Sequence, residues 1–228
     1  MSEHADTAHP ALRHHFDDLN QQHAAGTLGM WFFLVTEILF FGPLFFTYAL
    51  FRSGSLDPSF QNAFIAASHH QNITLGLTNT IVLIASSLTV ALGVYFAQTN
   101  KKKPLVLMLV LTLLCGVAFL VIKGIEYNQH FAHHLFPGQG FHWDGAPELA
   151  RGGQMFYILY FCMTGLHAFH MVIGIGIFIY ILMRAMRNDF SSDYYVPIEV
   201  SGLYWHFVDI VWIFLFPMLY LIDPASKH

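Results

Sequence analysis

Five long apolar stretches alternate with shorter polar segments along the chain. They run from about Leu28 to Phe51, Ile73 to Phe96, Pro104 to Ile125, Met155 to Met183 and Leu203 to Ile222. Each is long enough to cross a bilayer as an α-helix, because a hydrocarbon core of about 30 Å needs roughly 20 apolar residues. The pattern therefore predicts an all-α membrane protein, built as one bundle of five transmembrane helices.

The polar segments predict a simple domain organisation. We expect a polar, His-rich N-terminal segment over residues 1–27 and a five-helix transmembrane domain over residues 28–228. The first segment lacks the short apolar core and small-residue cleavage site of a signal peptide, so we expect no removable leader. The longest connection, Glu126 to Gly153, is rich in His, Gly and Pro and is typical of an interfacial loop.

Composition supports the membrane class and excludes others. Hydrophobic residues make up 55% of the chain and charged residues only 11%, whereas soluble domains carry about 25% charged residues. A soluble enzyme is excluded, since the chain could not cover its surface in water. The net charge of -4 offers no basic surface for nucleic acid.

The distribution of basic residues predicts the orientation in the membrane. One side of the five spans carries six basic residues, Arg13, Lys101, Lys102, Lys103, Arg184 and Arg187. The other side carries three, Arg52, Arg151 and Lys227. Because Lys and Arg accumulate on the cytoplasmic side, we expect a cytoplasmic N-terminus and a C-terminus outside.

Glu37 is the most conspicuous polar residue within the first span. It lies about nine residues into that span, near the middle of the membrane. Ionisable residues at such a depth are functional candidates, because burying a charge in hydrocarbon is costly. Two interpretations stay open: a carboxyl with a role in proton or lipid access, and a structural acid that is hydrogen bonded to a neighbouring helix.

The fifth span carries a polar stripe. Residues at alternating spacings of three and four share one helix face, and here they are Glu199, Gly202, His206, Asp209 and Ile213. Lipid cannot satisfy polar side chains, so this face must look into protein. A structural hydrogen-bond seam between helices is the favoured interpretation, and a proton path is the alternative.

His167 and His170 lie three residues apart on one face of the fourth span. With His206 from the last span they could bind a haem, and a b-type membrane cytochrome is therefore an open alternative. Packed histidines without a metal are the more common case, so we expect no metal site. Lys123 and Glu126, one turn apart, are expected to form a pair.

Four motifs, in order along the chain, resemble subunit III of the haem-copper oxidases. They are Gly29–Phe33 with Thr36–Phe41, Lys123–Tyr127, Thr164–Gly174 and Tyr204–Trp212. The resemblance covers nearly all of the chain after residue 25. Four spaced motifs in the right order make it specific.

The resemblance implies a subunit without redox centres of its own. No cofactor is expected in this chain, and the haems and copper are expected in partner subunits. Members of the family bind subunit I, assemble with subunit II, hold phospholipid, and support proton uptake and stability of the catalytic site. The implied location is the bacterial inner membrane, with a larger respiratory supercomplex as a further partner.

The resemblance also assigns positions. Glu37 falls on the family's carbodiimide-reactive membrane carboxyl, Glu126 and His206 fall near the packed interior, and Asp209 belongs to the signature of the last helix. The long form of the family has seven helices, of which this chain matches the last five. In related short forms the two missing helices can be appended to subunit I. The resemblance therefore implies a subunit I with extra C-terminal helices.

The electron donor is the remaining question at this stage. Subunit III chains of five helices occur in cytochrome c oxidases and in quinol oxidases. The quinol type often replaces the motif around the membrane carboxyl, whereas this chain keeps Glu37. The resemblance therefore favours a cytochrome c oxidase. A quinol oxidase subunit III and a relative that accompanies some nitric oxide reductases are the alternatives.

Overall fold

A computed structural model describes residues 12–138, 140–143, 146–192 and 194–221. Within them the chain forms α1 (Leu19–Arg52), α2 (Pro58–His69), α3 (Ile73–Gln98), α4 (Lys102–Ala132), the short 3₁₀ helix η1 (Pro147–Leu149), α5 (Ala150–Met186) and α6 (Val196–Tyr220). Five of these helices are long and apolar enough to cross a membrane, which confirms the predicted fold class. His4 and His9 of the His-rich N-terminal segment, and the basic residue Lys227, lie outside the described residues.

Four of the helices differ from the expected spans: α5 begins at Ala150 and α6 at Val196, earlier than Met155 and Leu203, and α1 and α4 are also longer. α1 begins at Leu19 rather than near Leu28, because the Asp18 side chain accepts a hydrogen bond from the Gln21 N–H at 2.6 Å and caps the helix. α4 continues to Ala132, so the loop expected from Glu126 onward starts later. Its polar last turns remain helical because Lys123, Glu126 and His130 are buried between helices.

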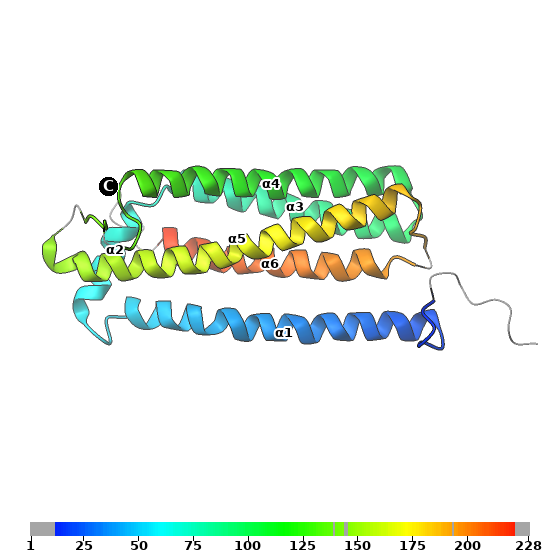
Figure 1. Ribbon diagram of the computed structural model, residues 1–228, viewed down its shortest axis with the longest axis horizontal. Helices are drawn as coiled ribbons and strands as arrows, with labels where there is room; N and C mark the ends of the chain where they lie inside the picture. Colours follow the sequence, from blue (N-terminus) through cyan, green and yellow to red (C-terminus); the bar gives the residue numbers. More distant parts are fainter. Residues whose placement is uncertain (1–11, 139, 144–145, 193, 222–228) are drawn as a thin grey trace, which may run out of the picture.

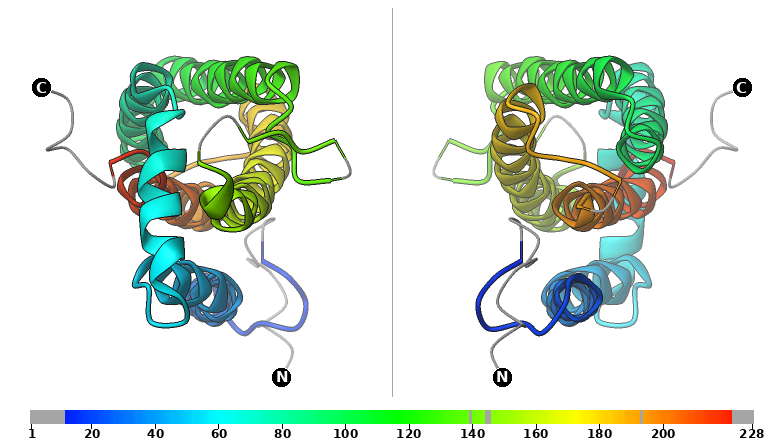
Figure 2. Two further views of the ribbon diagram at one scale, coloured as in Figure 1. Left: turned by 90° about the vertical axis from the view of Figure 1, so that its left-hand side faces the viewer. Right: turned by 90° about the vertical axis from the view of Figure 1, so that its right-hand side faces the viewer.

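The long helices run roughly parallel to one another, and α3, α4, α5 and α6 surround a common core (Figures 1 and 2). α1 lies outside this group and contacts mainly α6 and α5. The short helix α2 crosses one end of the molecule and connects α1 to α3 (Figure 2). The molecule therefore consists of a four-helix core with one helix attached along its side.

Tryptophan side chains of α6 fill the centre of the core. Trp205 and Trp212 are fully buried. Trp205 fits because glycines face it: a Cβ at Gly116 would come within 2.8 Å of its ring, and a Cβ at Gly174 within 3.2 Å. Small residues thus let the helices approach closely around a large ring, as is common in membrane bundles.

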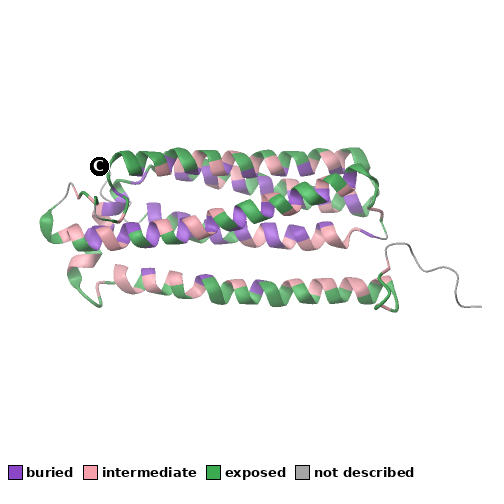
Figure 3. Cartoon of the chain, in the orientation of Figure 1, coloured by how far each residue is buried: buried purple, intermediate pink, exposed green. Residues whose placement is uncertain are grey.

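α1 is attached through a narrow stripe of side chains. Its buried residues are Leu34, Phe41 and Tyr48, which are seven residues apart. A seven-residue spacing keeps one seam of a helix against its neighbour, as in a coiled coil. The Tyr48 hydroxyl also donates a hydrogen bond to the Met218 carbonyl of α6. Most of the remaining surface of α1 is exposed or only partly covered (Figure 3).

Asp57 caps the start of α2, and its carboxylate accepts a hydrogen bond from the Ser59 N–H at 2.9 Å. That hydrogen bond from the backbone holds the pKa of Asp57 below its ordinary value, because it stabilises the ionised form. The helix packs on the start of α5, where Gly152 leaves room for Ala63. α2 therefore joins α1 to the core at this end of the molecule.

Candidate functional site: carboxyls and histidines within the membrane

Glu37 on α1 faces a histidine of another helix. Its Oε2 lies 3.0 Å from Nε2 of His170 on α5, and both side chains are mostly shielded from solvent. Phe41 covers the histidine ring at a centroid distance of 5.2 Å. The pair connects the outlying helix to the core near the middle of both helices, since Glu37 is the nineteenth of the 34 residues of α1.

The second nitrogen of His170 determines how many protons this pair holds. Nδ1 lies 2.8 Å from the Leu166 carbonyl oxygen, which can only accept a hydrogen bond, so Nδ1 is assigned a hydrogen. One further proton is then needed between Nε2 and the carboxyl. It sits either on Glu37, as a neutral acid, or on His170, as an imidazolium that faces a carboxylate. In both forms the pair is neutral overall and shares one transferable proton.

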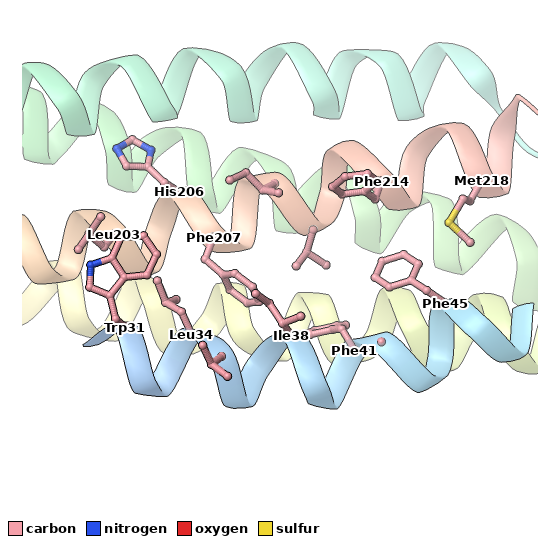
Figure 4. Close-up of a pocket in the computed structure, with 14 residues that line it drawn as sticks. Trp31, Leu34, Ile38, Phe41, Phe45, Leu203, His206, Phe207, Phe214 and Met218 are labelled. Atoms are coloured by element: carbon pink, nitrogen blue, oxygen red, sulfur yellow. The ribbon is translucent and has the colours of Figure 1, made fainter. Parts of the chain in front are cut away.

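A groove runs beside this pair between α1 and α6 (Figure 4). Its volume is about 660 Å³. The side chains that line it are apolar apart from His206, and those drawn from α1 and α6 point toward one another, among them Trp31, Leu34, Ile38, Phe41, Phe45, Phe207, Phe214 and Met218. The groove can accept a flexible hydrocarbon chain without burying polar groups.

Lys123 and Glu126 form an ion pair within the core. Lys123 Nζ lies 3.0 Å from Glu126 Oε2, with side-chain exposures of 3% and 1%. The remaining donors of the ammonium reach the hydroxyls of Tyr160 at 3.0 Å and Tyr220 at 2.7 Å. Both hydroxyls in turn donate to Glu126 Oε1, at 2.9 Å and 2.5 Å. Because an ammonium has three donors, every one of them is used.

Aromatic rings and one histidine complete this network. Lys123 Nζ lies 4.7 Å from the centre of the Tyr160 ring and 5.1 Å from that of Trp212, distances at which a ring face attracts a cation. His130 lies 4.0 Å from Glu126 and hydrogen bonds Gln71 at 3.0 Å. A polar pocket of about 200 Å³, lined by Glu126, His130 and residues near the end of α4, adjoins the pair. The network ties α4, α5 and α6 together at the end that carries α2.

Polar contacts also connect α6 to α3. The indole N–H groups of Trp205 and Trp212 donate to the hydroxyls of Ser86 and Thr80, at 3.0 and 3.1 Å. His206 Nδ1 lies 2.7 Å from the Ser87 hydroxyl. Two polar faces of α6, rather than the one predicted stripe, thus hold it to α3.

Asp209 lies next to this seam, yet its carboxyl is not part of it. The residue is 3% exposed, and neither carboxyl oxygen has a hydrogen-bond partner within the described residues. The Ser87 hydroxyl is nonetheless near enough to interact with the carboxyl as a hydrogen-bond donor, and the Cys115 thiol interacts with it electrostatically. Asp209 therefore differs from Glu37 and Glu126, which both have partners.

Glu199, the first residue of the predicted polar stripe, lies in the first turn of α6 and contacts α1. Its Oε2 is 3.0 Å from Nε2 of His23 at the start of α1. Ile213 is 47% exposed, so the stripe leaves the protein interior before it ends. The predicted face is interior at His206 and Asp209 and turns outward beyond them.

The predicted histidine cluster does not come together as a haem site would require. His170 uses both ring nitrogens in contacts with protein groups, Leu166 and Glu37. His167 is buried between the rings of Phe119 and Trp212, each at 5.3 Å, with both nitrogens unpaired. Within the described residues, no group of three or more His, Cys, Asp or Glu side chains is placed to hold a metal ion. With both its nitrogens engaged, His170 is not available as a haem ligand in this arrangement.

Comparison with known proteins gives a consistent set of relatives. The family model for cytochrome c oxidase subunit III matches residues 15–223. The chain is 31% identical over 197 residues to "Cytochrome c oxidase subunit 3" of Corynebacterium diphtheriae, covering 86% of this chain and 88% of that protein. It is 29% identical over 199 residues to the protein of the same name from Alkalihalophilus pseudofirmus, covering 87% of each. It is also 30% identical over 194 residues to "Quinol oxidase subunit 3" of Bacillus spizizenii, covering 85% of each.

Proposed function

Because the chain belongs to the subunit III family of the haem-copper oxidases, we propose that it serves a proton-pumping cytochrome c oxidase. Membership of the family makes it a multi-pass membrane protein and a non-redox accessory subunit that associates with other oxidase subunits. The finer proposal is that it binds subunit I, assembles with subunit II, and supports proton uptake and the stability of the catalytic site. The haems and copper then belong to those partners.

The observation that carries this proposal is the Glu37–His170 pair. Its two groups share one proton near the middle of the membrane, at the contact between α1 and the core. Such a pair can take up or release a proton while the helices stay in place. We propose that it supports proton delivery to subunit I and limits inactivation during turnover.

The groove between α1 and α6 supports the proposal of a bound phospholipid. Its volume is about 660 Å³, and its walls are almost entirely apolar. An acyl chain offers no hydrogen-bond donor or acceptor, so it matches these walls. A lipid held there would fill the space beside the seam that attaches α1.

The exposed outer surface of α1 supports the proposal of an elongated subunit I. Phe32, Leu39 and Phe46, which do not line the groove, are each more than half exposed in this chain. Extra C-terminal helices of subunit I could cover them in the complex. The excess of basic residues at one end supports a cytoplasmic N-terminus, by the positive-inside rule.

A quinol oxidase is the second candidate, favoured by the 30% identity to a relative of that name. The first experiment is purification in mild detergent through a tag on this chain, with identification of the subunits and an optical spectrum. We expect a haem-copper subunit I, extended at its C-terminus, and oxidation of reduced cytochrome c. Oxidation of quinol alone would assign the second candidate. Copurification of a nitric oxide reductase in place of an oxidase would assign the relative that accompanies those enzymes. A pigmented chain that purifies alone would overturn all three.

Two variants of Glu37 separate a proton role from a structural one. Glu37→Gln keeps a donor for His170 Nε2 but cannot release the carboxyl proton, whereas Glu37→Leu removes the contact. We expect both enzymes to assemble, with several-fold slower steady-state turnover or faster inactivation during turnover. If Glu37→Gln behaved like the wild type and only Glu37→Leu were impaired, the carboxyl would be structural.

A further inference from the structure

A small pocket lies at one end of the molecule, where the α3–α4 turn meets the end of α5 (Figure 1). Its volume is about 220 Å³. Lys102 joins the two sides of this pocket, because its Nζ donates a hydrogen bond to the Met186 carbonyl oxygen at 2.9 Å. The last carbonyls of a helix carry a partial negative charge. Lys102 therefore fixes the turn against α5 and compensates the end of that helix.

The charged side chains that line the pocket are cations. Lys101 and Lys102 line it together with Asn100 and Asn188, and no Asp or Glu is found among the described residues of its wall. Asp189, which follows Asn188, is paired instead with Arg184 at 3.1 Å. An ammonium has three donors, and Met186 takes only one of those of Lys102. The pocket therefore has the charge and the donors to hold an anion.

The start of α4 favours an anion at the same place. Lys101 is the N-cap residue of this helix, and its side chain makes no capping hydrogen bond. The first N–H groups of a helix have no acceptor within the helix, and the positive end of the helix dipole attracts negative charge. The N–H groups of the first turn thus reinforce the two lysine side chains.

The rest of the pocket is apolar and lies at the edge of the membrane. Phe96, Leu105 and Phe190 complete its wall. Tyr95 and Tyr180, in the last two turns of α3 and α5, are both exposed. Exposed tyrosines at helix ends are typical of the level of the lipid head groups. A ligand that fits here combines a negatively charged head with an apolar part.

An anionic phospholipid has this combination. In the proposed orientation this end of the molecule faces the cytoplasm, where the leaflet carries anionic lipids, and basic pockets between transmembrane helices on that side bind their head groups. We propose that the pocket binds the phosphate of an anionic phospholipid through Lys101 and Lys102, while Phe96 and Phe190 contact the start of its acyl chains. A free phosphate ion matches the lysines but leaves the apolar wall uncovered.

This site is distinct from the apolar α1–α6 groove. The wall of that groove contains no Lys or Arg among the described residues, so it has no reason to select a lipid by its charge. The pocket at the end of α5 does. The inference goes beyond the proposed function, because it does not depend on whether the oxidase uses cytochrome c or quinol.

Two neighbouring lysines provide a variant and its matched control. Lys101→Gln removes a cation from the pocket, whereas Lys103→Gln removes the same charge two residues away, from a side chain that does not line it. Both lysines are exposed, so neither change disturbs the core. The delipidated complex is titrated with phosphatidylglycerol and with phosphatidylcholine, and bound lipid is counted by native mass spectrometry.

We expect the wild-type complex and Lys103→Gln to bind one phosphatidylglycerol several-fold more tightly than phosphatidylcholine. We expect Lys101→Gln to lose most of this preference. The same loss in both variants would assign the effect to diffuse surface charge and would overturn the proposal. So would equal binding of the two lipids by the wild type.

A photoactivatable phosphatidylglycerol locates the site without any substitution. With a diazirine beside the head group, in nanodiscs of phosphatidylcholine, it should label residues 96–105 or 185–190 of the wild-type chain. Excess phosphatidylglycerol should suppress the label, and excess phosphatidylcholine should not. Labels confined to α1 and α6 would overturn the proposal. Suppression by inorganic phosphate as effective as that by phosphatidylglycerol would identify free phosphate as the ligand and would exclude a lipid.

Discussion

Lys123 and Glu126 illustrate how single side chains are accommodated inside this bundle. Each charge is almost fully buried, and Tyr160 of α5 and Tyr220 of α6 hydrogen bond both Lys123 Nζ and Glu126 Oε1. Breaking one half of a buried pair leaves the other charge without compensation and costs about 3–5 kcal/mol. The pair is therefore stable only as a complete unit.

This arrangement predicts the effect of removing one partner. We expect Lys123→Met to lower the melting temperature of the purified complex strongly, because Glu126 and two tyrosines lose their cation. The double variant Lys123→Met with Glu126→Leu should recover much of the loss, since an apolar pair can replace a buried ion pair. Thermal unfolding of the three variants measures this. Additive losses in the double variant would contradict the prediction.

The sequence predicted the Lys123–Glu126 pair because the two residues are one helical turn apart. It did not predict Tyr160 and Tyr220, or His170 as the partner of Glu37, since those groups come from helices far away along the chain. Tyrosines look like ordinary apolar residues in a hydropathy pattern. A long-range partner of a buried acid is specified by helix packing, which a single sequence does not display.

At the scale of helices, close approach depends on individual glycines. A Cβ at Gly152 on α5 would overlap the Cβ of Ala63 on α2 and lie 3.3 Å from a ring carbon of Phe60. Neither a backbone nor a Cβ can move aside as a long side chain can. Gly124 on α4, in contrast, has no atom within 4 Å of that position.

We therefore expect Gly152→Ala to destabilise the protein by about 1–3 kcal/mol, the usual cost of overpacking. Gly124→Ala is the control and should leave stability equal or slightly higher, because alanine favours a helix over glycine. Thermal unfolding of the detergent-solubilised complex compares the two. Equal melting temperatures would show that α2 is free to shift away from α5.

Helix boundaries were predictable only where polarity and packing agree. The apolar core of α3 is close to the expected span, since its neighbours are polar and exposed. α4 extends past its apolar part because Glu126 and His130 are covered by other helices. A polar residue that finds a partner inside the bundle cannot be distinguished, in sequence, from one that ends a helix.

At the scale of the whole molecule, the two ends differ in charge. The start of α1, the α3–α4 turn and the α5–α6 connection lie at one end, with Lys101, Lys102 and Arg184 (Figure 1). α2 and the histidines that follow α4 lie at the other. The class of fold and the number of spans were evident from hydropathy alone, but the lateral position of α1 was not, because a narrow seam leaves no strong pattern.

Cysteine labelling tests the orientation that this charge difference predicts. With Cys115 and Cys162 replaced by alanine, Thr99→Cys should react with a membrane-impermeant maleimide only in inside-out vesicles. Gln61→Cys on α2 should react only in right-side-out vesicles. Both positions are exposed in this chain. The reverse pattern would place the N-terminus outside.

The neutral pair of Glu37 and His170 has an electrical consequence. While it holds its shared proton, the membrane voltage exerts no net force on it. Once that proton leaves, a single charge remains about halfway across the bilayer, where 100 mV changes its free energy by roughly 1 kcal/mol, half the value for a complete crossing. In the proton role proposed for the pair, the membrane voltage would therefore act on each departure of that proton.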